Sequence, residues 1–375
     1  MRAHVPALDG VRGLAILLVM VLHFTSFPQM TADVLVDKVF RGVAIAGWCG
    51  VDLFFVLSGF LITGILVDAK GTDRYFTTFF ARRVLRIFPL YYSFLVVAFF
   101  VVPLAVPAFA TKGATQAWYW AYLSNVRVAC VGWEPPLWIG HFWSLAVEEQ
   151  FYLVWPLVVF ALSKRSLSYL CVAILPISLA LRIAWLAHGN SDAAYTLMPC
   201  RMDALATGAL GAIAVRSDVP SDTLRRAARV GLAFGLVALG VVAVWRRGLH
   251  ERDAIVCTVG YTLNALSFVS LIVLAVFGDA TSLAGRALCH PALRFFGRYS
   301  YGLYVFQQPV AFALLRWAPV PSLPRVAGAH LPAELALQAL GFGVTTACAL
   351  TSWYLLEAPY LRLKRRFEYA ARSPG

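Results

Sequence analysis

Arg12 and His23 lie in an otherwise apolar stretch, residues 8–24, that reads LDGVRGLAILLVMVLHF. Their separation of eleven positions equals about three helical turns, so both side chains are expected on one helix face, about 16 Å apart along its axis. Lipid offers no hydrogen-bond partners, so ionisable side chains at that depth usually face a protein interior or a water-filled cavity. We therefore expect His23 to be the base of a membrane-embedded enzyme.

A pair of adjacent carboxylates, Glu148 and Glu149, lies in the segment HFWSLAVEEQFYLVWP. Successive side chains on a helix point about 100° apart, so only one of the two can fully face a shared cavity. That carboxylate is a candidate catalytic residue, which could orient His23 and hold its productive tautomer or could bind a substrate hydroxyl. The alternative is a structural ion pair with an arginine of another span. Trp143 and Ser144 are candidate substrate contacts.

The segment GVDLFFVLSGFLITGIL places Asp52 near the outer end of a helix and Ser58 near its middle. A carboxylate in an apolar helix requires a cation or several donors, so Asp52 is a candidate substrate-binding residue. Ser58 is another, although its hydroxyl could simply bond back to its own helix. Gly59 and Gly64 would let another helix backbone approach closely.

Three arginines, Arg82, Arg83 and Arg86, open a further apolar segment, FFARRVLRIFPLYY. Arginine binds phosphate oxygens in a bidentate manner and stays charged, so this cluster favours a phosphorylated ligand such as coenzyme A or a nucleotide. By charge count alone, the cluster favours an anchor on the cytoplasmic leaflet, but the presence of arginine without lysine shifts the interpretation towards the phosphorylated ligand.

Other polar groups carry weaker signals. Arg201 and Asp203 predict a buried ion pair that could do no more than fix helix register. Tyr301, in GRYSYGLYVFQQPV, is a candidate substrate contact, although packing is the default interpretation. No metal site is expected, because the histidines and the seven cysteines lack ligand spacing. Cys130 is the cysteine expected to be the most accessible.

The outward loop expected at 110–142 is rich in aromatic residues. It fits an interfacial aromatic belt, or a platform on which sugar rings stack. The aromatic residues at and beside this loop are Trp118, Tyr119, Trp120, Tyr122, Trp133, Trp138 and Trp143.

The positions of these residues depend on membrane helices. The chain of 375 residues is 60% hydrophobic and 14% charged, well below the roughly 25% charged residues of soluble proteins. Stretches long enough to cross a bilayer recur throughout, which predicts an all-α, polytopic bundle of about ten transmembrane helices in one domain, residues 1–375. The expected spans are 13–28, 47–67, 88–109, 143–162, 167–187, 197–215, 228–245, 255–277, 299–317 and 334–357.

Most lysines and arginines fall in the tails and even-numbered loops, which predicts that both termini are cytoplasmic. The net charge of +13 is then explained by topology and by attraction to anionic lipids. The basic residues form no single stripe, so no nucleic-acid partner is expected.

Six blocks in order, including LDGVRGLAILLVMVLHF, FARRVLRIFPLYY, FWSLAVEEQFYLVWP and SWYLLEAPY, resemble the membrane acyltransferase 3 family, whose members include O-antigen, exopolysaccharide and macrolide acyltransferases. The resemblance implies transfer of an acyl group, usually from acetyl-CoA, to a glycan hydroxyl. Arg12 and His23 match the family's Arg-x10-His pair, Arg83 and Arg86 its Arg-x-x-Arg pair, and Glu148 or Glu149 its acidic motif.

The resemblance implies further expectations. Because Arg12 is distant from His23, we expect it to be an electrostatic partner of the donor and not a direct stabiliser of the oxyanion, and transfer could be direct or pass through an acyl-His23. Many relatives append a hydrolase-like domain, which this chain is expected to lack. Gln307 and Gln308 stand where many relatives have His-Trp.

We expect a bacterial inner-membrane enzyme that binds acyl-CoA, a glycan or lipid-linked saccharide and membrane lipids, with other polysaccharide-biosynthesis proteins as further partners. The alternatives are a macrolide or other small-molecule O-acyltransferase, a proton-coupled transporter, and a non-catalytic scaffold for polysaccharide export.

Overall fold

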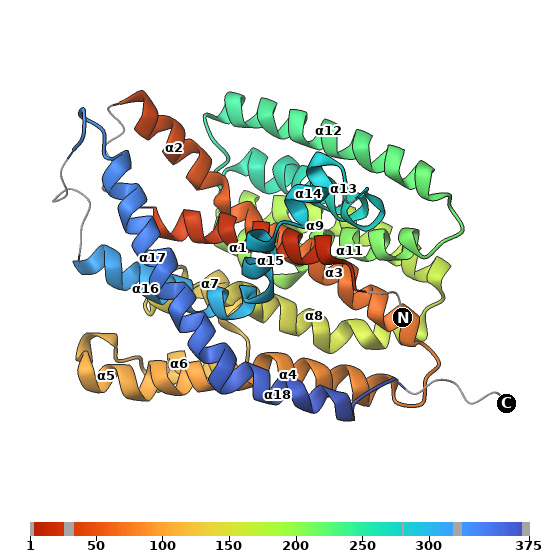
Figure 1. Ribbon diagram of the computed structural model, residues 1–375, viewed down its shortest axis with the longest axis horizontal. Coiled ribbons are helices and arrows are strands. Elements are labelled where there is room, and N and C mark those ends of the chain that lie inside the picture. The colour runs from red at the N-terminus through yellow and green to blue at the C-terminus, as the bar shows by residue number, and fades with distance from the viewer. Residues whose placement is uncertain (1–3, 26–33, 280, 318–324, 370–375) are drawn as a thin grey trace. The chain divides into compact units, whose positions relative to one another are not determined.

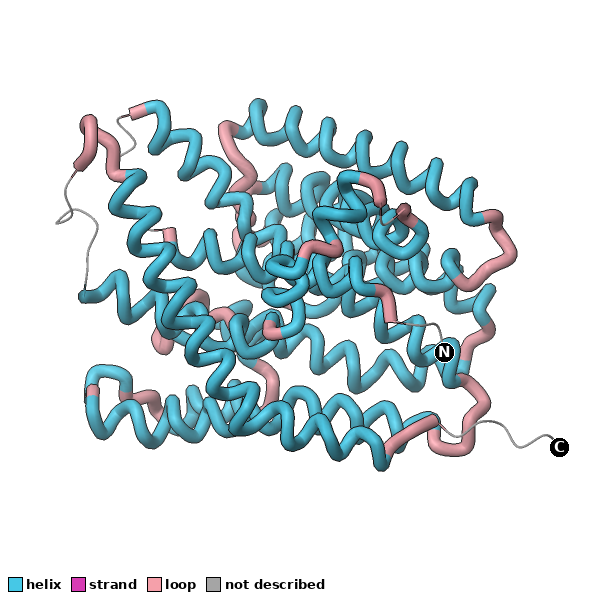
Figure 2. The backbone as a smooth tube through the Cα atoms, viewed as in Figure 1, coloured by secondary structure: helices cyan, strands magenta, loops and turns pink. Residues whose placement is uncertain are grey.

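The computed structural model describes residues 4–25, 34–279, 281–317 and 325–369. Within these ranges the regular structure is helical, and the only strand-like pairing is an isolated bridge between Val326 and Ala329 (Figure 2). The all-α prediction is confirmed.

Eight helical segments among the described residues are long and apolar enough to cross a membrane, so the chain is a multi-pass membrane protein. They are Pro6–Phe24, Leu35–Ala69, Tyr75–Ala105, Phe142–Ala161, Lys164–Ala187, Ser221–Arg246, Val256–Phe277 and Leu331–Arg366.

Two other expected spans are present as helices of 18 residues each, α11 (Met198–Val215) and α16 (Ser300–Trp317). Neither meets the same standard of apolar length, because α11 carries Arg201 and Asp203 and α16 carries two glutamines and Arg316. Polar side chains of this kind are tolerated in membrane helices that face protein.

The chain divides into two compact units. Unit 1 contains Ser58–Ser217 and the segment that begins at Leu350, and unit 2 contains His4–Leu57 and Asp218–Ala349. Two of the divisions fall inside the helices α3 (Cys49–Ala69) and α17 (Leu331–Ser352), and a third falls between Ser217 and Asp218.

Unit 1 holds the second half of α3 and nine further helices. These are α4 (Tyr75–Val96), α5 (Val102–Ala105), α6 (Gly113–Trp120), α7 (Ser124–Val131), α8 (Phe142–Ala161), α9 (Lys164–Ala187), α10 (Ser191–Thr196), α11 and α18 (Ala358–Arg362). The segment 110–142, expected as a loop, thus contains the two helices α6 and α7.

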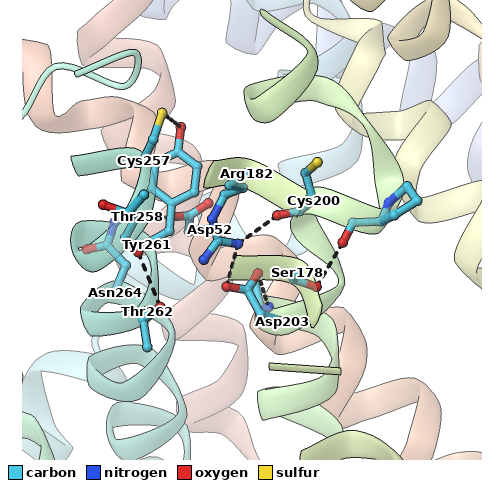
Figure 3. A network of polar contacts seen from close by, with 12 residues as sticks. Asp52, Ser178, Arg182, Cys200, Asp203, Cys257, Thr258, Tyr261, Thr262 and Asn264 are labelled. Carbon is cyan, nitrogen blue, oxygen red and sulfur yellow. Dashed lines mark hydrogen bonds and ion pairs between the residues drawn. The ribbon is translucent and has the colours of Figure 1, made fainter. Parts of the chain in front are cut away.

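A buried ion pair connects α9 and α11, which pack along one another. Nη1 of Arg182 lies 2.7 Å from Oδ2 of Asp203 and donates to the carbonyl of Cys200 (Figure 3). The sequence predicted a pair of Asp203 with Arg201, and Arg182, on another helix, is an ion partner of Asp203 that was not predicted. In unit 1, Arg201 lies over the ring of Tyr195, 5.5 Å from its centroid.

Unit 2 holds α1 (Pro6–Phe24), α2 (Leu35–Ile45), the first half of α3, and six later helices. The later helices are α12 (Ser221–Arg246), α13 (Tyr261–Phe277), α14 (Leu283–Leu288), α15 (Pro291–Arg298), α16 and α17. The helix α1 packs against α13, α14, α15 and α16. Figure 1 shows α12 lying along α13, and these two helices are in contact.

Glycines bring α1 into backbone contact with its neighbours. A Cβ at Gly10 would overlap the carbonyl of Leu288, and one at Gly13 would overlap the carbonyl of Leu293. From the other side, a Cβ at Gly297 would overlap the carbonyl of Asp9. Small residues at such crossings let helix backbones approach closely, so the position of α1 in unit 2 is tightly defined.

Candidate functional site

His23 lies in the last turn of α1 and is half-buried. Its Nδ1 is 2.9 Å from the carbonyl oxygen of Val19. A carbonyl can only accept a hydrogen bond, so the neutral ring must carry its hydrogen on Nδ1 to make this contact. The lone pair is then on Nε2, which is the arrangement that a general base requires.

Arg12 lies about three turns earlier on α1, as the spacing predicts. The Arg12 side chain is 40% exposed, and its Nη1 lies 3.9 Å from Oδ1 of Asp9. In addition, Nε2 of His4 lies 2.9 Å from Oδ2 of Asp9. The Arg12 end of α1 is therefore more polar and more open than the rest of the helix.

In unit 1, Glu148 belongs to a chain of hydrogen bonds that joins α3 and α8. The hydroxyl of Ser58 donates to Oε1 of Glu148 at 2.6 Å, and the hydroxyl of Tyr152 donates to Ser58 at 3.0 Å. Ser58 thus bonds to another helix and not back to its own. Glu148 accepts in this chain, as an ionised carboxylate does.

Glu149 is also half-buried, and its electrostatic neighbours include Glu148 and Arg83. The next residue, Gln150, donates from Nε2 to the carbonyl of Tyr122 and to Oδ1 of Asn125, both at 2.9 Å. These hydrogen bonds connect α8 to α7 and to the residues just before it, and they were not predicted from the sequence.

The three arginines of α4 have different partners in unit 1. Nη1 of Arg82 donates to the carbonyl of Phe367 at 2.9 Å, and Nη1 of Arg86 lies 3.7 Å from Oε2 of Glu357. Arg83 lies over the ring of Tyr152, 5.8 Å from its centroid. A guanidinium has five N–H donors, so the contacts of Arg82 and Arg83 use only some of the donors of these two residues.

In unit 2, Asp52 lies in the first turn of α3 and is only 1% exposed. Its Oδ2 accepts a hydrogen bond from Nδ2 of Asn264 on α13 at 3.1 Å (Figure 3). This matches the expectation that a carboxylate at this depth needs donors. The partner itself, an asparagine in an apolar helix, was not singled out from the sequence.

The aromatic residues at and beside the segment 110–142 pack largely against protein. Trp143 is buried, with its ring centroid 4.6 Å from that of Tyr195. The hydroxyl of Ser144 donates to the carbonyl of His141 at 3.4 Å. Of the seven aromatic residues named above, those with partial exposure are Trp118, Trp120 and Trp133, so a sugar platform would have to use them.

On α16, Tyr301 is half-buried, and Gln307 is fully buried. Neither amide atom of Gln307 has a hydrogen-bond partner among the described residues. An unpartnered amide is unfavourable in a dry interior, and such a group is often reserved for a ligand. In the sequence, the signal for this polar position was the pair Gln307 and Gln308 in an apolar segment.

Comparisons with known proteins agree with these features. A family described as "Acyltransferase domain" (Acyl_transf_3) matches residues 5–354. The chain is 26% identical to the peptidoglycan O-acetyltransferase OatA of Listeria monocytogenes over 82% of its length, and 26% identical to the putative peptidoglycan O-acetyltransferase YrhL of Bacillus subtilis over 95%. It is also 26% identical to the O-acetyltransferase OatA of Staphylococcus aureus over 82%.

The chain spans about half the length of these relatives, covering 50%, 55% and 50% of them respectively. No solved structure matches it.

Proposed function

We propose that this chain, which belongs to the Acyl_transf_3 family, transfers an acetyl group from acetyl-CoA to a hydroxyl of a cell-surface or exported glycan. The observation that carries the proposal is the family match over residues 5–354, together with relatives named as O-acetyltransferases. Because two of the relatives are named for peptidoglycan, we take peptidoglycan as the first acceptor to test.

In the proposed reaction, Nε2 of His23 takes the proton from the acceptor hydroxyl. The resulting alkoxide attacks the thioester carbonyl carbon, and a C–O bond forms. The tetrahedral intermediate then collapses, the C–S bond breaks, and the departing thiolate takes the proton back from the imidazolium. The bond from Nδ1 to Val19 supports this role because it leaves Nε2 unprotonated.

The arginines of α4 are proposed to bind the phosphates of coenzyme A, because a guanidinium is always charged and binds phosphate oxygens in a bidentate manner. Arg12 is proposed as an electrostatic partner of the donor, which is consistent with its exposure. Glu148, which already accepts from Ser58, has the chemistry to bind an acceptor hydroxyl.

Asp52, Ser58, Trp143, Ser144 and Tyr301 are proposed to contact the substrate, and Glu149 to support Glu148 at the acceptor. The distribution of lysine and arginine supports a bacterial inner-membrane location with the termini and the donor on the cytoplasmic side.

The test uses the full chain in proteoliposomes, with labelled acetyl-CoA as donor and peptidoglycan fragments as acceptor. We expect His23→Ala and His23→Gln to reduce acetyl transfer by about 10² to 10⁴, the usual contribution of a general base. The control is His188→Ala, because His188 is exposed at the end of α9.

Wild-type transfer by folded His23→Ala protein would remove His23 from the mechanism. Retained donor hydrolysis without transfer to peptidoglycan would show that the acceptor belongs to another glycan class. Mass spectrometry of envelope glycans from cells with and without the protein would then identify that acceptor.

A further inference from the structure

Unit 2 has a cavity of about 510 Å³ at the end where α1 begins. Its walls come from the start of α1, the first turns of α12, the end of α13 and the segment that contains α14. Leu232, Leu271, Leu274 and Leu288 supply much of its lining. None of the residues proposed above for catalysis or substrate binding lines this cavity.

Two arginines on α12, Arg225 and Arg229, also line the cavity and lie about one helical turn apart. Arg225 donates to Asp222, and no carboxylate forms an ion pair with Arg229 among the residues that the structure describes. Asp279 is the acidic group in the lining, and its pKa is lowered by hydrogen bonds from the hydroxyl and amide of Thr281. The lining thus carries two guanidiniums and one carboxylate, and Asp222, which lies outside the lining, pairs with Arg225.

The helix α12 also forms the apolar surface beside the cavity. Beyond its first turns, α12 exposes large apolar side chains, including Val230, Phe234, Val237 and Val241. In a membrane protein such a surface faces lipid tails, so Arg225 and Arg229 at the helix start lie near headgroup level. The arginine end of the cavity therefore lies beside the apolar exposed surface of α12.

We propose that this cavity binds one anionic phospholipid of the leaflet next to the start of α1, such as phosphatidylglycerol. Arg225 and Arg229 hold the phosphodiester, because guanidiniums match phosphate oxygens in a bidentate manner. One acyl chain lies along the leucines. The apolar lining would accept any lipid chain, so the two arginines provide the selectivity for negative charge.

The experiment is native mass spectrometry of the full protein released from nanodiscs that contain phosphatidylglycerol and phosphatidylcholine in equal amounts. We expect the wild type to retain phosphatidylglycerol preferentially. Each arginine near a membrane surface contributes about fivefold in binding to anionic lipid, so the double variant Arg225→Gln/Arg229→Gln should lose most of that preference. The matched control is Arg226→Gln, on the same turn but exposed and outside the lining.

A second pair of variants tests the apolar part. Ala284 lines the cavity, whereas Ala287, on the same short helix, does not, and both are exposed. Ala284→Trp should therefore reduce lipid retention severalfold with both arginines intact, and Ala287→Trp should not.

Three results would overturn the proposal. Equal retention of both lipids by the wild type would remove the charge selectivity, and full retention by the double arginine variant would remove the two arginines. Displacement of the lipid by soluble glycerol phosphate or by acetyl-CoA would show a site for a free anion or for the donor instead.

Discussion

The hydrogen bond between Ser58 and Glu148 connects α3 and α8 at 2.6 Å. Hydrogen bonds between membrane helices average about 0.6 kcal/mol in double-mutant cycles, with a maximum near 1.7. We predict a coupling free energy in this range for Ser58→Ala with Glu148→Ala, measured by unfolding of the protein in detergent. Ser168→Ala is the control, because Ser168 donates to Lys164 in its own helix, and it should show no coupling to Glu148. Zero coupling for Ser58 would contradict the contact.

Two buried glutamines of unit 2 should respond in opposite ways to replacement by leucine. The amide of Gln307 has no hydrogen-bond partner in the described ranges, whereas Nε2 of Gln338 donates to the hydroxyl of Thr25 at 3.0 Å. Removing an unsatisfied group is neutral or stabilising, but removing one partner of a buried bond costs about 1 kcal/mol or more. Gln307→Leu should leave the thermal midpoint unchanged or raise it, and Gln338→Leu should lower it. A clear loss of stability in Gln307→Leu would mean that its amide is bonded in the folded protein.

At the scale of helices, Gly59 should be the most sensitive small residue of α3. A Cβ at this position would overlap the backbone carbonyl of Leu205 on α11, and a backbone cannot move aside as a side chain can. We predict that Gly59→Ala lowers the unfolding free energy by about 1–3 kcal/mol. Gly240→Ala on α12 is the control, because nothing lies within 4 Å of its Cβ position. Equal stability of the two variants would contradict this packing.

Much at this scale could be predicted from the sequence. Apolar length located the helices, and the close approach expected at Gly59 is present, although Gly64 faces the flexible side chain of Arg216. Partner choice could not be predicted, because it depends on which helices are neighbours. Asp203 pairs with Arg182, a residue of another helix that the sequence did not single out as its partner. The helices α6 and α7 were missed because each has only eight residues, too few for a clear periodic signal.

For the whole molecule, the side of the membrane is the main open prediction. Cys130 is exposed and lies in the segment that the lysine and arginine distribution places outside. An impermeant maleimide applied to intact cells should therefore label the wild type and the Cys289→Ser variant, but not Cys130→Ser. Labelling only after the cells are lysed would invert the proposed orientation.

The sequence correctly predicted an all-α, polytopic membrane protein, but it was less accurate on the number of strongly apolar spans. About ten spans were expected, and eight helical segments in the described part are apolar enough to cross by themselves. The other two helices are more polar because they carry buried groups such as Arg201 and Gln307. Composition alone cannot separate a polar helix packed within protein from one outside the membrane.

The glycine contacts of α1 have a consequence for enzyme activity. Gly10 and Gly13 fix the rotation of α1 about its own axis relative to the neighbouring helices, and His23 lies on the same helix. A methyl group added at Gly13 would turn or displace the whole helix, so the imidazole would point elsewhere although nothing near it had changed. A loss of transfer in such a variant would result from a misplaced imidazole, although the substitution lies about 15 Å away along the helix.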